Sequence, residues 1–439
     1  MNIFSQPTTY GVLATLTSAG AAMLILNRPN EASPTPAPRI SASSARTAPL
    51  IETQAAEEVR AKLAPRMSLE NKGWQHVADA RSTGDGSHYR EALGIAAELE
   101  GAEETKFAGM LLRGHVLHQM HRFADARVVA ESLVSERGMH TDHGLLGDIL
   151  LDMGDVTGAI AAYEKQMALR PGLEAYARAA QVRWLKGQTG GAIEAMAMAA
   201  SAGSARNPEP VAWTLSLLAL YQCQTGADAD ALASADAALR LSPGHPRALV
   251  AKARIEMGRG RFAEALPLLN QAAARLPEPA TLWLLTDCLK ATGDQTRAAR
   301  MESGWMKRAA KEDPRTLALY LATVGEDAAR ALQLAQAELK VRQDVFTHDA
   351  VAWAALAAGK PALARDHIAL ALAEGTVDAR LCLHAGLIAR ASGDGPVAER
   401  FLDQAKELRH MLFPAERHRL DRAISEAGQL TANLTENQR

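Results

Sequence analysis

The segment His143–Pro171, HGLLGDILLDMGDVTGAIAAYEKQMALRP, decides the fold. Two apolar stretches lie on either side of Gly154, and Pro171 follows the second of them. Glycine readily adopts the left-handed backbone conformation that joins two helices, and proline cannot continue a helix. The segment therefore predicts a helix, a glycine turn, a second helix and a stop.

The surroundings of Ala159, in the second predicted helix, recur along the chain. The equivalent alanines are Ala92, Ala126, Ala159, Ala192, Ala231, Ala265, Ala298, Ala331, Ala364 and Ala398. Successive members are 33 or 34 residues apart, except for an interval of 39 before Ala231, which contains a Ser/Ala/Gly-rich stretch that we expect to be a longer loop. A fixed period of this length indicates a repeat array, which explains how 439 residues can fold without several separate domains.

Two other positions recur with the alanine. Glycine stands five residues before the alanine in most units, at Gly154, Gly187, Gly226, Gly260, Gly293, Gly359 and Gly393. In two units His121 and Glu326 occupy this position, and in the second of these a glycine, Gly325, lies one residue earlier. A second small residue lies about twelve residues before it, at Gly114, Gly147, Ala180, Ala219, Ala253 and Ala352. Small side chains at both positions allow two helix axes to approach to about 8–10 Å. Each unit is therefore expected to be an antiparallel helical hairpin.

This pattern resembles the tetratricopeptide repeat family, and it extends over about 69–408. The resemblance implies an all-α, right-handed α-solenoid of about ten helical hairpins, which we place at 53–430, with a disordered tail at 431–439. The charged stretch at 413–424 is expected to form a helix that caps the last unit. Two short stretches, 347–353 and 378–386, look like parts of bacterial repeat proteins of the cell envelope.

Composition narrows the possible partners. Lys and Arg total 48 against 50 Asp and Glu, so the chain has no excess positive charge with which to bind nucleic acid. Three widely spaced cysteines form neither a disulfide framework nor a metal motif. The sequence also lacks the glycine-rich nucleotide loops and the GxSxG nucleophile motif. We therefore expect no enzyme activity, no cofactor and no small-molecule substrate.

The N-terminal segment predicts a membrane helix. After a tail at 1–9, residues 10–26 contain no charged residue, and we assign 10–27 to a transmembrane or signal-anchor helix and 28–52 to a Pro/Ala/Ser-rich linker. The arginines that follow the apolar segment favour a cytoplasmic solenoid. The resemblance of segment and linker to a signal anchor favours an extracytoplasmic one in the cell envelope, which we expect. A secreted protein or a cytoplasm-facing one remains an alternative.

A concave groove is the expected functional site, because the first helices of successive repeats line such a groove. Groove-facing positions that we expect to bind a partner protein are Trp184, Trp213, Arg247, Arg254, Trp283, Asp287 and Trp353. Tryptophan and arginine are enriched among residues that anchor protein partners. The leading hypothesis is therefore a membrane-tethered scaffold for protein–protein interaction.

Two alternatives stay open. Histidines cluster in sequence at His115, His118, His121, His140 and His143, so that neighbouring helices could bring imidazoles together around a metal ion, in a metal-binding or metal-assisted hydrolase site. No HExxH motif accompanies them, and solvated surface histidines are the simpler interpretation. The second alternative is a structural spacer in an envelope assembly, in which curvature and anchoring are the function.

Overall fold

The computed structural model describes residues 54–204 and 206–436, with side chains described within 68–426 apart from 82 and 205. In this part of the chain all regular structure is helical, and no strand occurs. The predicted tail, membrane helix and linker at 1–52 lie outside the described residues. None of the described helices has the length and apolar character that crossing a bilayer requires.

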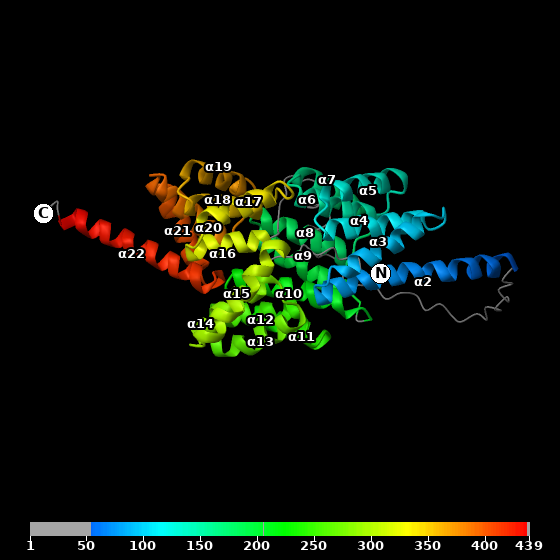
Figure 1. Ribbon diagram of the computed structural model, residues 1–439, viewed down its shortest axis with the longest axis horizontal. Helices are drawn as coiled ribbons and strands as arrows, with labels where there is room; N and C mark the ends of the chain where they lie inside the picture. Colours follow the sequence, from blue (N-terminus) through cyan, green and yellow to red (C-terminus); the bar gives the residue numbers. More distant parts are fainter. Residues whose placement is uncertain (1–53, 205, 437–439) are drawn as a thin grey trace, which may run out of the picture.

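Ten helical hairpins follow one another along the chain (Figure 1). Their helices are α2 (Gln54–Thr83) with α3 (Ser87–Glu100), α4 (Lys106–Gln119) with α5 (Phe123–Glu136), α6 (His140–Asp152) with α7 (Val156–Leu169), α8 (Leu173–Leu185) with α9 (Thr189–Ser201), α10 (Pro208–Gln224) with α11 (Asp228–Leu241), α12 (Pro246–Gly258) with α13 (Phe262–Arg275), α14 (Pro279–Ala291) with α15 (Gln295–Glu312), α16 (Pro314–Val324) with α17 (Ala328–Leu339), α18 (Val345–Ala357) with α19 (Pro361–Leu372), and α20 (Ala379–Ala391) with α21 (Gly395–Glu407). The number, order and phase of the hairpins confirm the predicted solenoid.

The recurring small residues lie where they were expected. All ten alanines of the series are on the second helix of a hairpin and are buried. On the first helix of the third hairpin, a Cβ added to Gly147 would overlap the ring of Tyr163, so the paired helices touch closely there. Gly154, with φ of 82°, makes the left-handed turn between α6 and α7, and His121 takes the same conformation with φ of 57°.

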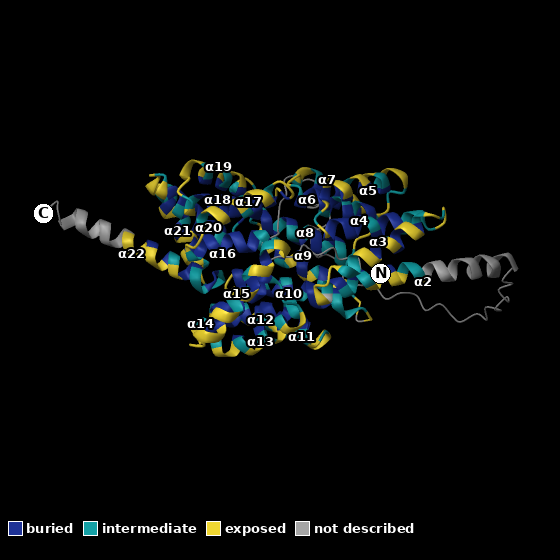
Figure 2. Cartoon of the chain, in the orientation of Figure 1, coloured by how far each residue is buried: buried dark blue, intermediate teal, exposed yellow. Residues whose placement is uncertain are grey.

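Burial follows the superhelix. Figure 2 shows buried residues concentrated along its interior and exposed residues on the outer helices and turns. One large apolar cluster runs from Leu150 in α6 to Phe413 near the C-terminus, and therefore connects most of the repeats. Smaller apolar clusters lie at the first two hairpins and at the C-terminal end, so the core extends along the stacked repeats.

The superhelix closes on itself. The amide of Gln343 donates to the carbonyl of Asp152 at 3.1 Å, and the hydroxyl of Thr376 donates to the carbonyl of Leu185 at 2.8 Å. The Lys186 ammonium pairs with Glu374 in the same region. Turns of the third and fourth hairpins therefore contact the loops before and after the ninth.

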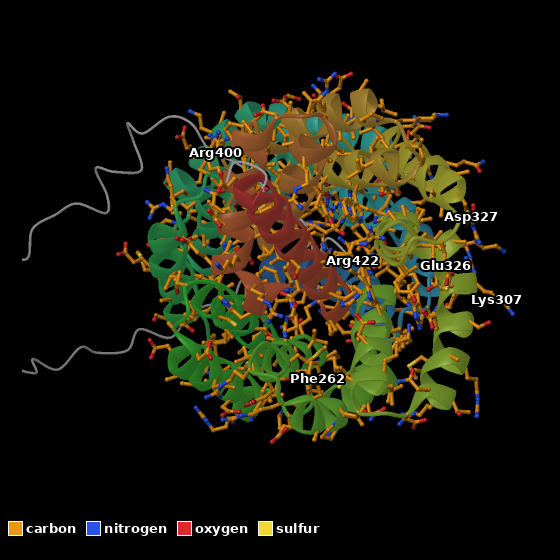
Figure 3. The ribbon with its side chains drawn as sticks, turned by 90° about the vertical axis from the view of Figure 1, so that its left-hand side faces the viewer. Phe262, Lys307, Glu326, Asp327, Arg400 and Arg422 are labelled. Atoms are coloured by element: carbon orange, nitrogen blue, oxygen red, sulfur yellow. The ribbon has the colours of Figure 1, made fainter. Side chains whose placement is uncertain are left out.

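A C-terminal segment follows the last hairpin. It consists of the short 3-10 helix η1 (Arg409–Met411) and of α22 (Pro414–Glu436). Viewed from that end of the molecule, the helix that carries Arg422 lies across the centre of the ring formed by the repeats (Figure 3). The helix continues to Glu436, six residues beyond the end at 430 that we predicted for the solenoid, and 437–439 lie outside the described residues.

Candidate functional site

The concave face is covered in its central part by the C-terminal segment. His410 contacts the carbonyl of Cys223 through Nε2 at 2.8 Å, and Arg417 donates to the carbonyl of Met257 at 3.0 Å. Arg419 donates to the carbonyl of Thr323 at 2.6 Å. These acceptors lie on α10, α12 and α16, so one short segment ties together first helices of three hairpins. The sequence predicted only that this segment caps the last repeat. In the structure it also contacts these three hairpins.

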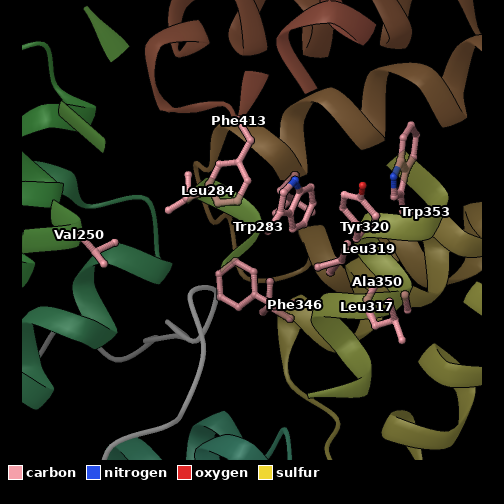
Figure 4. Close-up of a cluster of buried hydrophobic side chains, with 14 of the residues drawn as sticks. Val250, Trp283, Leu284, Leu317, Leu319, Tyr320, Phe346, Ala350, Trp353 and Phe413 are labelled. Carbon is pink, nitrogen blue, oxygen red and sulfur yellow. The ribbon is translucent and has the colours of Figure 1, made fainter. Parts of the chain in front are cut away.

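Phe413 is the apolar centre of this contact. Its ring packs edge-on against Trp283, and the guanidinium of Arg380 lies over both rings, 4.8 Å from Phe413 and 5.3 Å from Trp283. Arg380 also pairs with the buried carboxylate of Glu416. Figure 4 shows Phe413 facing Trp283, with Tyr320 on the other side of the indole. The groove here is filled by the chain's own residues.

The four tryptophans expected in the groove are buried inside the protein. Trp184, Trp213, Trp283 and Trp353 keep 5%, 5%, 1% and 2% of their surface exposed. The Trp184 indole donates to Gln224 at 2.7 Å and the Trp353 indole to Thr323 at 3.0 Å. The expectation that these rings are exposed to a partner is therefore corrected: in a chain with few aromatic residues, they pack between repeats.

The charged groove residues are placed differently from one another. Arg254 donates to the carbonyl of Met411 at 3.1 Å and lies over the Phe413 ring, so the C-terminal segment covers it. Asp287 is buried, and burial raises its pKa to about 7. Arg247 donates to Glu278 at 2.9 Å on the wall of an open pocket. Of these three residues, only Arg247 lines that pocket.

Of the histidines of the second hairpin, His115 and His118 are buried and His121 is half-buried in the turn. His115 is buried against the edge of Trp74, and burial lowers its pKa to about 3. His118 is buried and contacts Asp152 through Nε2 at 2.8 Å. Burial also lowers the pKa of His121 to about 3. Packing and the contact with Asp152 account for these three residues structurally.

His140 and His143 do not join them. Both are on the first turn of α6, and Nε2 of His140 lies 3.2 Å from a guanidinium nitrogen of Arg170. Among the described side chains, no group of three potential metal ligands forms from the five histidines at 115–143. The metal site that sequence spacing suggested at this place is therefore not assembled. The correction has a simple cause: spacing along a helix cannot tell a buried face from an exposed one.

An open pocket of about 780 Å³ lies where the start of the superhelix faces its middle. We call it the inter-turn pocket. Its wall comes from the end of α2, the start of α3, the turn after α4, the starts of α10, α12 and α14, and the junction of α15 with α16. Residues from hairpins far apart in sequence therefore share one cavity.

The inter-turn pocket carries balanced charge. Its lining includes five carboxylates, Asp79, Glu209, Glu278, Glu312 and Asp313, and five basic side chains, Arg81, Arg90, Arg247, Arg308 and Lys311. Arg81 lies 3.7 Å from Glu209. Burial lowers the pKa of the Arg81 guanidinium, and the nearby positive charge of Arg247 lowers it further. Apolar and neutral residues such as Leu276, Pro277 and Tyr89 complete the wall. The cavity offers donors and acceptors of both signs without an excess of either.

Repeated helical hairpins with small residues at each crossing define the class of helical repeat proteins. A sequence model of the tetratricopeptide repeat matches residues 143–172, the unit whose sequence carries the pattern most clearly. One unit of the chain thus matches the tetratricopeptide repeat, and the whole array has the fold of an all-helical repeat protein. No curated protein matches the sequence.

Several solved structures of other proteins are similar to this chain. The crystal structure of a Rap protein complexed with competence and sporulation factor is 14% identical, with a TM-score of 0.49 over 80% of this chain and 98% of that chain. The human IFIT1 dimer with PPP-AAAA is 12% identical, with a TM-score of 0.47 over 81% of this chain and 85% of that one. The crystal structure of MamA is 20% identical, with a TM-score of 0.30 over 37% of this chain and 93% of that one.

Proposed function

We propose that this protein is a non-catalytic, membrane-tethered scaffold that holds an extended segment of a partner protein in the inter-turn pocket. The support from the fold is general, because helical repeat proteins of this type present extended concave surfaces for binding other proteins. The choice of the pocket rests on this chain's own residues.

The observation that carries the proposal is the contrast between the covered and the open parts of the concave face. Its central part is covered by Phe413 and the arginines of the C-terminal segment. The inter-turn pocket is open and is lined by five carboxylates and five basic side chains. A peptide backbone with charged side chains of both signs has the donors and acceptors that such a wall can pair.

The tether is a separate part of the proposal. It is supported by the charge-free segment at 10–26 and the Pro/Ala/Ser-rich stretch that follows it. We place the solenoid on the extracytoplasmic side. Fractionation of cells with alkaline carbonate extraction tests the tether, and protease added to intact cells and to spheroplasts tests the side. Release of the full-length protein by carbonate would contradict membrane insertion.

Site-specific photocrosslinking tests the pocket. A photoreactive amino acid replaces Lys311, an exposed residue of the pocket lining, in the full-length protein in cells. The control position is Val128, which is 65% exposed on α5. We expect one defined partner to crosslink from position 311 and not from position 128. Adding Arg247→Glu should weaken this crosslink, because it reverses a charge on the pocket wall.

Two outcomes would overturn the proposal. Equal labelling of the same proteins from both positions would mean that the pocket has no partner of its own. The absence of any defined crosslink from position 311 would favour the structural spacer, in which the curved rod and its anchor are the function.

A further inference from the structure

Three side chains with metal-binding chemistry meet at the first helical hairpin. His76 and Asp79 are three residues apart and lie on the same face of α2. His88 is the second residue of α3, directly after the turn that joins these helices. All three are half-buried, so they are held by the fold and remain accessible from solvent.

The donor atoms are close enough to share one ion. The Nδ1 atoms of His76 and His88 are 3.2 Å apart, and the ligand atoms of all three residues lie within 4.8 Å of one another. With metal–nitrogen distances of about 2.0–2.1 Å, two imidazole ligands on a tetrahedral ion are about 3.3–3.4 Å apart. The imidazole pair is therefore already near the separation that a tetrahedral ion requires.

The surroundings of Asp79 favour ligation. The Gln75 amide donates to Oδ1 of Asp79 at 2.8 Å, an outer contact that orients the carboxylate. We propose that His76, Asp79 and His88 form a binding site for a divalent transition-metal cation of the Zn²⁺ type. Two imidazoles and one carboxylate suit Zn²⁺ and its neighbours, whereas Mg²⁺ and Ca²⁺ prefer oxygen ligands alone.

The position of the site gives the ion two effects. It joins α2 to α3 across their turn, which fixes the first hairpin of the solenoid. Asp79, together with Gln75 and Tyr89, also lines the inter-turn pocket, so the ion lies at the rim of that cavity. Three protein ligands leave a fourth position for water or for a group of a bound molecule.

The chain contains a matched comparison. His348 and His367 also place their Nδ1 atoms 2.9 Å apart, and their rings are stacked at 5.2 Å. Within the described part of the chain, this second pair has no third potential ligand nearby. Among the described side chains, His76, Asp79 and His88 form the one group of three potential metal ligands. An imidazole pair without a carboxylate is the control for what the complete site adds.

Isothermal titration of the full-length, untagged and chelator-treated protein with Zn²⁺ tests the proposal. We expect one equivalent to bind and to raise the melting temperature. His88→Gln and Asp79→Asn should each weaken binding by about tenfold or more and abolish the thermal shift. His348→Gln should bind Zn²⁺ as the wild type does. Circular dichroism of each metal-free variant checks its folding, and Asp79→Asn carries the test if His88→Gln does not fold.

Several results would overturn the site. They are unchanged affinity in both His88→Gln and Asp79→Asn, an equal loss in His348→Gln, and the absence of stoichiometric binding to the wild type. Each of these results is independent of the crosslinking outcome, because the assay contains no partner protein.

Discussion

The ring of Phe413 lies 4.9 Å from that of Trp283 in an edge-to-face contact, although α14 and the C-terminal segment are far apart in sequence. Trp283 is buried on the first helix of the seventh hairpin, so the aromatic partner of its ring is a residue of the same chain. In this contact the central part of the concave face is occupied by an aromatic side chain of the chain's own C-terminal segment, with Arg380 over both rings. This contact explains why binding by a second protein is expected at another part of this face.

The first prediction concerns this contact. Phe413→Ala removes a buried ring, and large-to-small changes of this kind cost about 3–5 kcal/mol. We expect a loss of unfolding free energy in that range, measured by urea denaturation. The fluorescence emission of the native variant should also shift to the red as Trp283 meets water. Ile424→Ala, on the exposed side of α22, is the control and should change neither quantity appreciably.

The second prediction tests the small residue at the helix crossing. Gly147→Ala places a methyl group against the ring of Tyr163, and overpacking of this kind costs about 1–3 kcal/mol. Alanine is a better helix former than glycine by about 1 kcal/mol, so Gly304→Ala, in open space on α15, should stabilise the protein. Urea denaturation of both variants measures the difference. Similar changes of the same sign would contradict close packing at Gly147.

Repeat architecture was predictable from the sequence because each crossing imposes the same local requirement. The ten alanines and the turn glycines are set by contacts within one hairpin, which sequence spacing reports directly. The left-handed conformation of His121 could also be predicted from the sequence, because this residue occupies the position of the turn glycine. Local rules therefore sufficed for the hairpins.

The candidate site was less predictable because it depends on contacts between distant hairpins. Trp184 packs near Phe346, and Gly154 meets the backbone of Gln343, pairs that only the curvature of the superhelix brings together. The sequence signalled that the charged stretch at 413–424 forms a helix. Its spacing gave no indication that Phe413 fills the groove. His76 and His88 meet within one hairpin, across the turn between α2 and α3, and were not among the five histidines singled out, because those five were chosen for their close spacing along the chain.

The third prediction concerns pH. Burial raises the pKa of Asp287 to about 7, with Lys290 opposing the shift and Glu416 adding to it. The unfolded chain titrates near the ordinary value of about 3.9, so between these pH values the folded protein holds the extra proton. The contribution of Asp287 to the unfolding free energy is therefore fully present below about pH 4. It is lost as the pH rises to about 7, with a slope of up to about 1.4 kcal/mol per pH unit.

Asp287→Asn removes this titration. The unfolding free energy of the variant relative to the wild type should increase between about pH 4 and pH 7 and then level off. Urea denaturation at a series of pH values measures it, with Asp403→Asn at an exposed site of α21 as the control. A constant difference across this range would show that Asp287 is not held protonated.

The fourth prediction tests a buried ion network that joins distant hairpins. Arg342 is buried between Asp152, at 3.4 Å, and Asp344, at 3.5 Å, and it lies over the ring of Phe123. Arg342→Met removes the charge that faces these carboxylates, and breaking a buried pair costs about 3–5 kcal/mol. We expect a loss of that size in urea denaturation. Arg127→Met breaks an exposed pair with Glu131 and should cost less than about 1 kcal/mol.

The fifth prediction asks whether the superhelix is closed in solution. Gly187 and Gly226 are both turn glycines with positive φ, 68° and 77°. Alanine at either position is strained by about 1–2 kcal/mol. A Cβ on Gly187 would also lie 2.6 Å from the carbonyl oxygen of Gly375, in the loop after the ninth hairpin, whereas Gly226 has open space around it.

Closure therefore predicts unequal effects from two chemically identical substitutions. Gly187→Ala should cost about 1–3 kcal/mol more than Gly226→Ala, because the backbone of one turn must move away from the other. Small-angle X-ray scattering should show a larger radius of gyration for Gly187→Ala alone. Equal unfolding free energies and equal radii would mean that the two turns do not touch in solution.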